Sequence, residues 1–93
     1  MIPSDSGISR PQRLSDAPSG RRLFIHAVNA ASDEGLEWVS RLRELGFIEG
    51  EPVQVLRRGQ PGGEPLAVRV GVSTFALRRA EAACIQVVPA DAS

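Results

Sequence analysis

The sequence predicts a mainly β domain, a small barrel of five short strands with one α-helix between the first and second strands. Several short segments alternate apolar and polar side chains, which is typical of half-buried strands. Glycine and proline separate these segments, and only one segment carries leucines at helical spacing. A single helix cannot cover both faces of a flat five-stranded sheet, whereas a closed barrel leaves no exposed strand edge. These observations together favour the barrel.

The 93 residues are enough for one small domain, near the lower size limit for a single hydrophobic core. Residues 1–13 are expected to form a disordered leader, because their few apolar side chains cannot offset the entropy lost on ordering. They contain no apolar run typical of a signal peptide, and no segment approaches the roughly 18 apolar residues of a membrane span. Residues 14–88 are predicted to form the domain, and residues 89–93 a frayed tail.

The domain is expected to begin with a loop and a strand. Residues 14–20 are rich in turn-forming residues, among them Pro18 and Gly20, and predict the loop. Residues 21–29 alternate with apolar side chains on both faces. They predict the first strand, covered fully on one face and partly on the other.

The next segment predicts the helix. Apolar side chains recur there every three residues and form one stripe of Leu36, Val39, Leu42 and Leu45. Ser32 or Asp33 is expected to cap the N-terminus, where acidic side chains also suit the helix dipole. Gly46 is expected to end the helix in a left-handed conformation, and Phe47 to supply the apolar contact that follows such a stop.

Four more strands complete the predicted sheet. They are expected at residues 53–58, 66–70, 73–79 and 85–88. Between the second and third of these, Gly71-Val72 predicts a two-residue hairpin turn of type II′, which requires glycine at its first central position. A short helical turn is expected just before the last strand.

Composition weighs against several classes of function. Eleven arginines balance eleven acidic residues, so the chain lacks the net positive charge typical of nonspecific nucleic-acid binding. Cys84 is the single cysteine, so no disulfide can form within the chain, and a reducing, cytoplasmic location is expected. Its apolar neighbours predict a buried, unreactive thiol.

Catalytic and metal-binding patterns are absent from the sequence. His26 is the only histidine, and a lone histidine on a strand is more often a packed or rim residue than a metal ligand. Gly62-Gly63 is not followed by the lysine and hydroxyl residue of a phosphate-binding loop. No nucleophile is paired with a base. We therefore expect neither an enzyme nor a bound cofactor or metal.

Periodicity alone leaves an SH3-like and an OB-like barrel open. Four segments in order along the chain resemble the FeoA family. Residues 14–20 are similar to the family's opening L-x-D-L-P-x-G, with Ala17 in place of a larger apolar residue. Residues 41–53 resemble its helix-to-strand signature. Residues 63–70 are similar to its G-x-P-[IL]-x-[VIL], and residues 75–87 to its closing A-L-R-x-x-E-A-x-x-I-x-V.

This resemblance implies an SH3-like barrel over residues 14–88. Residues 21–28 and 71–75 depart from the family's usual pattern. These departures bear on the expected surface and not on the expected fold. The resemblance also implies a small cytosolic accessory protein of ferrous-iron uptake, whose partner is the membrane GTPase-permease FeoB. The alternative is an SH3-like regulator or a nucleic-acid-binding module, against which the balanced charge and the few aromatic residues weigh.

Five residues are candidates for partner contacts. Barrels of this shape bind extended segments in apolar grooves rimmed by charge. That chemistry points to one aromatic residue and several arginines, namely Trp38, Arg41, Arg57, Arg58 and Arg69. Trp38 is expected beside the helix stripe, either as a core residue or as an exposed anchor. Arginines at strand ends are more often simply solvated.

Overall fold

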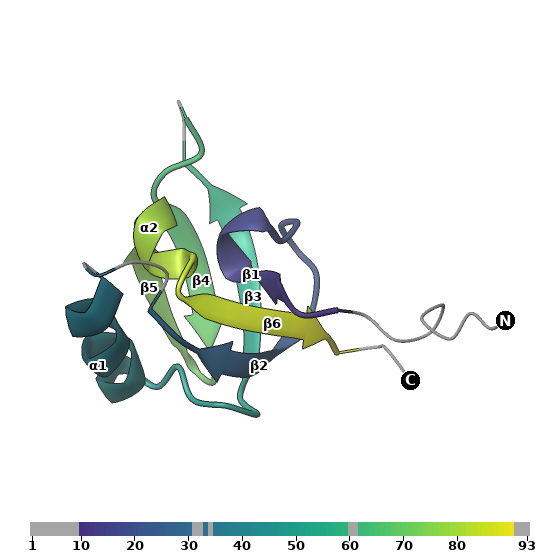
Figure 1. Cartoon of the computed structure of the whole chain (residues 1–93). Helices are drawn as coiled ribbons and strands as arrows, with labels where there is room; N and C mark the ends of the chain where they lie inside the picture. The colour runs from purple at the N-terminus through teal and green to yellow at the C-terminus, as the bar shows by residue number, and fades with distance from the viewer. Residues whose placement is uncertain (1–9, 31–32, 34, 60–61, 91–93) are drawn as a thin grey trace, which may run out of the picture.

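The computed structural model describes residues 10–30, 33, 35–59 and 62–90. Within these residues, six antiparallel strands form one sheet in the order β1-β6-β2-β3-β4-β5 (Figure 1). The strands are β1 Gln12–Arg13, β2 Leu23–Val28, β3 Pro52–Arg58, β4 Leu66–Val70, β5 Ser73–Leu77 and β6 Ile85–Pro89. The helices of the same residues are the 3₁₀ helix η2 (Leu14–Asp16), α1 (Gly35–Leu45) and the short α2 (Arg79–Ala82).

The sheet does not close, so the prediction of a five-stranded barrel is wrong in both strand number and closure. Among the described strands, β1 and β5 are the two edges and do not pair with each other. β1 is only two residues long and pairs with β6, so it is too short to bridge the sheet to β5. Register shifts at Ile25/Ala27 and Val55/Arg57 bend β2 and β3 instead. Figure 1 accordingly shows β2 and β6 crossing β4 and β5 steeply.

The beginning of the domain also differs from the prediction. β1 lies in the segment expected to be a disordered leader, and η2 lies in the segment expected to be a loop. The side chains of Leu14, Ser15 and Ala17 are buried, so this part of the chain belongs to the core. Because β1 comes first, α1 follows the second strand rather than the first. The remainder of the expected leader, residues 1–9, and most of the expected tail, residues 91–93, lie outside the described residues.

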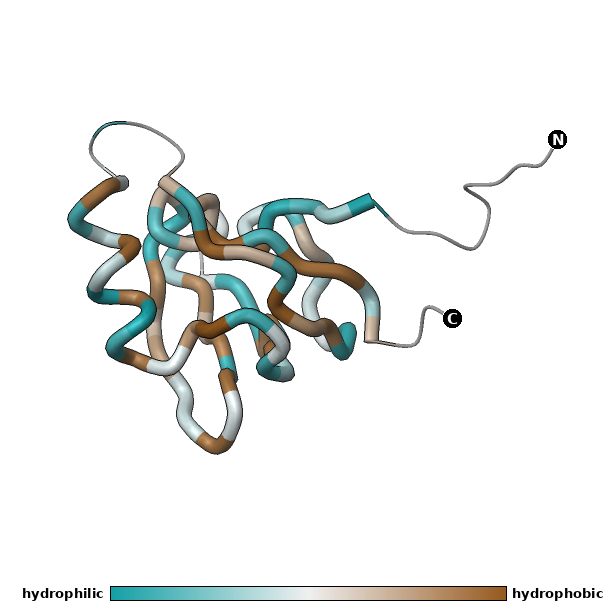
Figure 2. The backbone as a smooth tube through the Cα atoms, turned by 60° about the horizontal axis from the view of Figure 1, so that its bottom comes forward, coloured by the Kyte–Doolittle hydropathy of each residue, from teal (hydrophilic) through white to brown (hydrophobic). Residues whose placement is uncertain are grey.

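One hydrophobic core fills the bent sheet. Alternate residues of β3, β4 and β6 are buried, as the period of two along a strand requires. Figure 2 shows hydrophobic segments in brown and hydrophilic segments in teal along the tube. From outside the sheet, Leu42 of α1 and Phe47 add buried side chains to this core, and Trp38 packs against it while staying half-buried.

The end of α1 confirms the predicted glycine stop. Gly46 has a φ of 113°, a conformation that suits glycine because other residues would crowd their Cβ. The Gly46 N–H donates to the Arg43 carbonyl at 3.1 Å, and the Phe47 N–H donates to the Leu42 carbonyl at 3.0 Å. This pair of hydrogen bonds is the Schellman motif, and it places Phe47 in the core. At the other end of α1, Ser32, one of the two expected caps, lies outside the described residues, and the carbonyl of the other, Asp33, accepts from the Leu36 N–H at 3.3 Å.

The hairpin between β4 and β5 confirms the second predicted turn. Val70 pairs with Ser73, leaving Gly71 and Val72 as the two turn residues. Gly71 has a φ of 57°. Val72, like the other described non-glycine residues, does not have a positive φ. That combination fits the type II′ turn. Among the described residues, none of the three helices is long and apolar enough to cross a membrane.

Candidate functional site

The five predicted contact residues do not form one site. Trp38 and Arg41 border a groove between α1 and β5. Arg57 and Arg58 lie at the end of β3, and Arg69 lies on β4, at the rim of a different hollow. The structure therefore divides the predicted residues among three surfaces.

The groove between α1 and β5, called here the α1–β5 groove, has a volume of about 140 Å³. Trp38, Leu42 and Leu45 line it from the helix, and Phe75 and Leu77 from the strand. The Phe75 ring packs on the buried Phe47 ring with centroids 5.8 Å apart, which fixes that wall to the core. Among the described strands, β5 pairs only with β4. An apolar groove beside an edge strand suits an extended peptide.

Arg58 has a role inside the domain. Its Nη2 donates to the Ser15 carbonyl at 2.8 Å and to the Ala17 carbonyl at 2.6 Å. The side chain thus ties the segment around η2 to β3, 41 to 43 residues away in sequence. Arg57, its neighbour, is exposed. The sequence alone could not distinguish the role of Arg58 from that of Arg57, because the role of Arg58 depends on a long-range contact.

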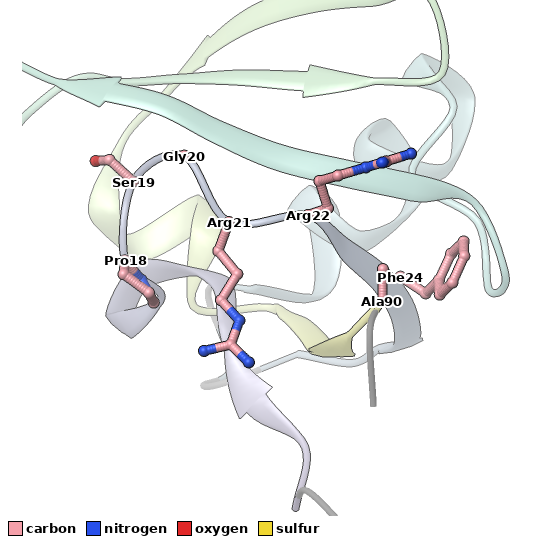
Figure 3. A pocket seen from close by; sticks show the side chains of 7 residues that line it. All are labelled: Pro18, Ser19, Gly20, Arg21, Arg22, Phe24 and Ala90. Carbon is pink, nitrogen blue, oxygen red and sulfur yellow. The ribbon is translucent and has the colours of Figure 1, made fainter. Parts of the chain in front are cut away.

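A third surface lies on the outer face of the sheet, where two adjoining hollows of about 650 and 300 Å³ share Arg22, Phe24 and Ala90. Figure 3 shows Arg21 and Arg22 pointing away from each other and Phe24 beside Ala90. Gln54 and Arg69 line the smaller hollow. We call this surface the arginine hollow and define it by Arg22, Phe24, Gln54, Arg69 and Ala90. Arg22 and Phe24 were not among the contact residues predicted from the sequence. Strand alternation nevertheless places both on the face of β2 opposite to that of the buried Leu23.

The remaining sequence candidates are not drawn into a reactive site. Cys84 is buried, as predicted, with its Sγ 3.7 Å from the Ala80 carbonyl oxygen. His26 is exposed on β2. Within the part of the chain that the structure describes, no three His, Cys, Asp or Glu side chains gather in an arrangement that could hold a metal ion.

An exposed ion pair holds the end of α1 to the turn before β3. Arg43 donates from Nη1 and Nη2 to the two carboxylate oxygens of Glu49 at 3.2 and 3.1 Å. This hydrogen bonding lowers the pKa of Glu49 below its usual value of 4.5. Since the pKa is lower in the folded than in the unfolded chain, ionised Glu49 stabilises the fold above the unfolded pKa. That contribution is lost as the pH falls through the folded pKa.

We therefore expect Glu49→Gln to lower the free energy of unfolding slightly at about pH 7 and not at acid pH, where the wild-type carboxyl is protonated as well. Urea unfolding of both proteins at about pH 7 and about pH 3 measures the difference. Added salt should reduce the difference at the higher pH, because the pair is exposed. An equal difference at both pH values would contradict the role of the ionised carboxylate.

Comparison with known proteins identifies one family. A family model described as the FeoA domain matches residues 12–89, which begins at β1 and ends with β6. A search of curated proteins finds no match.

Solved structures agree with the family match. The chain is similar to FeoA of Stenotrophomonas maltophilia, crystallised with zinc, at 38% identity and a TM-score of 0.71, with 86% of this chain and 91% of that chain covered. That protein is described as a procaryotic SH3 domain protein and a suggested ferrous iron transport activating factor. FeoA of Chlorobium tepidum is similar at 30% identity and a TM-score of 0.70, with 88% and 73% covered.

A third structural match concerns the fold alone. A manganese-dependent transcriptional repressor matches with a TM-score of 0.71 and 18% identity, over 94% of this chain and 47% of that chain. At that identity the likeness extends to the fold and carries no function across.

Proposed function

The chain belongs to the FeoA family of ferrous-iron transport accessory proteins, and from that membership we propose that it docks on the cytosolic part of the membrane transporter FeoB. Docking would modulate the assembly or GTPase activity of the transporter. The observation that carries the proposal is the family match over residues 12–89, joined by 38% identity to a suggested ferrous iron transport activating factor. The proposal places the protein in the cytoplasm and gives it no catalytic step of its own.

The α1–β5 groove is the docking surface we propose. It combines the half-buried indole of Trp38 with the exposed guanidinium of Arg41, a pairing that recurs at the centres of protein interfaces. Its walls are fixed to the core through Leu42 and Phe75, so a partner segment would meet a preformed surface. Arg58 is already hydrogen-bonded within the chain and is a poor candidate for a partner contact.

A binding titration of this protein against the purified cytosolic part of the transporter tests the proposal. We expect saturable binding, and we expect Arg41→Glu to weaken it at least about tenfold, because the substitution reverses a charge at the groove. Arg13→Glu is the matched control, since it makes the same charge change on β1, at an exposed position outside the groove.

The outcomes separate two questions. No binding at high micromolar concentrations would refute docking itself. Binding that Arg41→Glu leaves intact, while Arg57→Glu or Arg69→Glu weakens it, would refute only the choice of the α1–β5 groove. A circular dichroism spectrum of each variant confirms that the fold is retained.

A further inference from the structure

We propose that the arginine hollow is a separate binding site for an acidic, extended peptide segment that carries a bulky apolar side chain. The carboxylates of the segment would bind Arg22 and Arg69, and its apolar side chain would pack on Phe24. This site is on another face than the α1–β5 groove and does not depend on docking to the transporter.

Strand register brings the polar side chains together. Leu23 pairs with Val53, which places the preceding Arg22 beside Gln54, and Gln54 itself pairs with Arg69. The neighbours Leu23, Val53 and Val70 are buried, so Arg22, Gln54 and Arg69 project from the opposite, outer face. The three residues form one row across β2, β3 and β4.

The charge of this row is uncompensated. Among the described residues that line the arginine hollow none is acidic, although the whole chain carries as many acidic as basic residues. Within the described part of the chain, neither Arg22 nor Arg69 forms an ion pair or a side-chain hydrogen bond. At the rim, a carboxylate oxygen of Glu51 lies close to Gly71. Guanidinium groups match the planar carboxylate, with two parallel hydrogen bonds in the best geometry.

An apolar contact area adjoins the arginines. Phe24 is 41% exposed, and its strand partners are Pro52 and Val88. An exposed ring on a rigid strand offers a large contact area at little cost in side-chain entropy. Four other large apolar side chains of the described residues are exposed, and none of them lines the arginine hollow: Leu36, Ile48, Leu56 and Val72.

A peptide fits these groups better than other anions do. The Gln54 amide lies between the two arginines and can both donate to and accept from a peptide backbone. The hollow is open to solvent and lined from the turn at Pro18 to the hairpin at Gly71, which suits an extended ligand rather than a compact one. RNA recognition uses several stacking aromatic residues and a net basic surface, whereas this hollow has one ring and the chain has no net charge.

The test is an amide chemical-shift titration of the full isotopically labelled chain with the probe peptide acetyl-Glu-Phe-Glu-Glu-amide at low ionic strength. We expect saturable shifts confined to the arginine hollow, at Leu23, Val53, Arg69 and Gly71. Arg69→Glu should weaken binding at least about tenfold. Arg41→Glu, which makes the same charge change on α1, should leave the affinity within about twofold. The spectra of the variants also report whether each one is folded.

Three control ligands complete the test. The peptide acetyl-Gln-Phe-Gln-Gln-amide should bind at least about tenfold more weakly, because it lacks the carboxylates. Inorganic phosphate or a single-stranded RNA that moves the same amides at the same concentration would overturn the proposal in favour of a general anion surface. Absence of saturable shifts up to low millimolar peptide, or equal loss in Arg41→Glu and Arg69→Glu, would also overturn it.

Discussion

Replacement of Phe47 by alanine is expected to lower the free energy of unfolding by about 3–5 kcal/mol. Phe47 is the largest of the fully buried side chains described, and its ring packs on Phe75. The Schellman motif at the end of α1 fixes its backbone, so the neighbouring side chains cannot easily collapse into the space it leaves. For a domain of this size, such a loss is a large part of a total stability of about 5–15 kcal/mol.

Urea unfolding followed by the fluorescence of Trp38, the single tryptophan, measures this effect. Phe24→Ala is the matched control, because it removes the same ring from a position that is 41% exposed. We expect the control to cost about 1 kcal/mol or less. Similar losses in the two variants would mean that the buried contacts of Phe47 are not what stabilises the domain.

Replacement of Arg58 by alanine is expected to cost about 1.5–3 kcal/mol. The substitution removes a charged donor from two backbone carbonyls, those of Ser15 and Ala17, in a partly buried setting. It also frees the segment around η2 from β3. We therefore expect local opening of this segment in addition to the lower free energy of unfolding of the whole domain. Amide hydrogen exchange should therefore accelerate most at Ala17, whose N–H bonds to the Leu14 carbonyl.

Arg57→Ala provides the comparison for Arg58, since it removes the same side chain one residue earlier from an exposed position. Its effect on the free energy of unfolding should stay within about 0.5 kcal/mol. If the two alanine variants unfold at the same urea concentration, the hydrogen bonds of Arg58 contribute nothing measurable. If exchange at Ala17 is unchanged, Arg58 does not hold η2.

The parts of the fold that sequence predicted correctly are those with local causes. The end of α1 at Gly46 follows from a backbone conformation that glycine adopts most easily, and the hairpin at Gly71-Val72 follows from the same property. The strands from β2 onward follow from alternation over five or more residues. Each of these signals lies within a few neighbouring residues.

The parts that sequence missed depend on distant partners. β1 has two residues and therefore shows no period, and its place in the sheet comes from pairing with Gln86 and Val87. Closure of a barrel depends on whether the edge strands meet, which alternation along single strands does not report. The contact of Arg58 with Ala17 likewise spans 41 residues.

The candidate surfaces follow the same division. Trp38 and Arg41 were predicted as contact residues from their residue types alone, and both border the α1–β5 groove. Residue type could not show that Arg69 belongs with Arg22, because their proximity comes from the register of β2, β3 and β4. The prediction that Phe24 lies on a partly covered face is confirmed, because its side chain is 41% exposed.

The antiparallel pairing of β1 with β6 decides how this protein can be presented to a partner on a solid support. Gln12 lies opposite Val87, so the start of β1 and the end of β6 lie close together, and Figure 1 shows both strands on the side away from α1. A bead coupled beyond Ala90 would crowd the arginine hollow and leave the α1–β5 groove accessible. Coupling through Leu36→Cys on α1 would instead crowd the α1–β5 groove and leave the arginine hollow accessible. The coupling would be selective, because Leu36 is exposed while the native thiol of Cys84 is buried. The two attachments together therefore report which face a captured partner occupies.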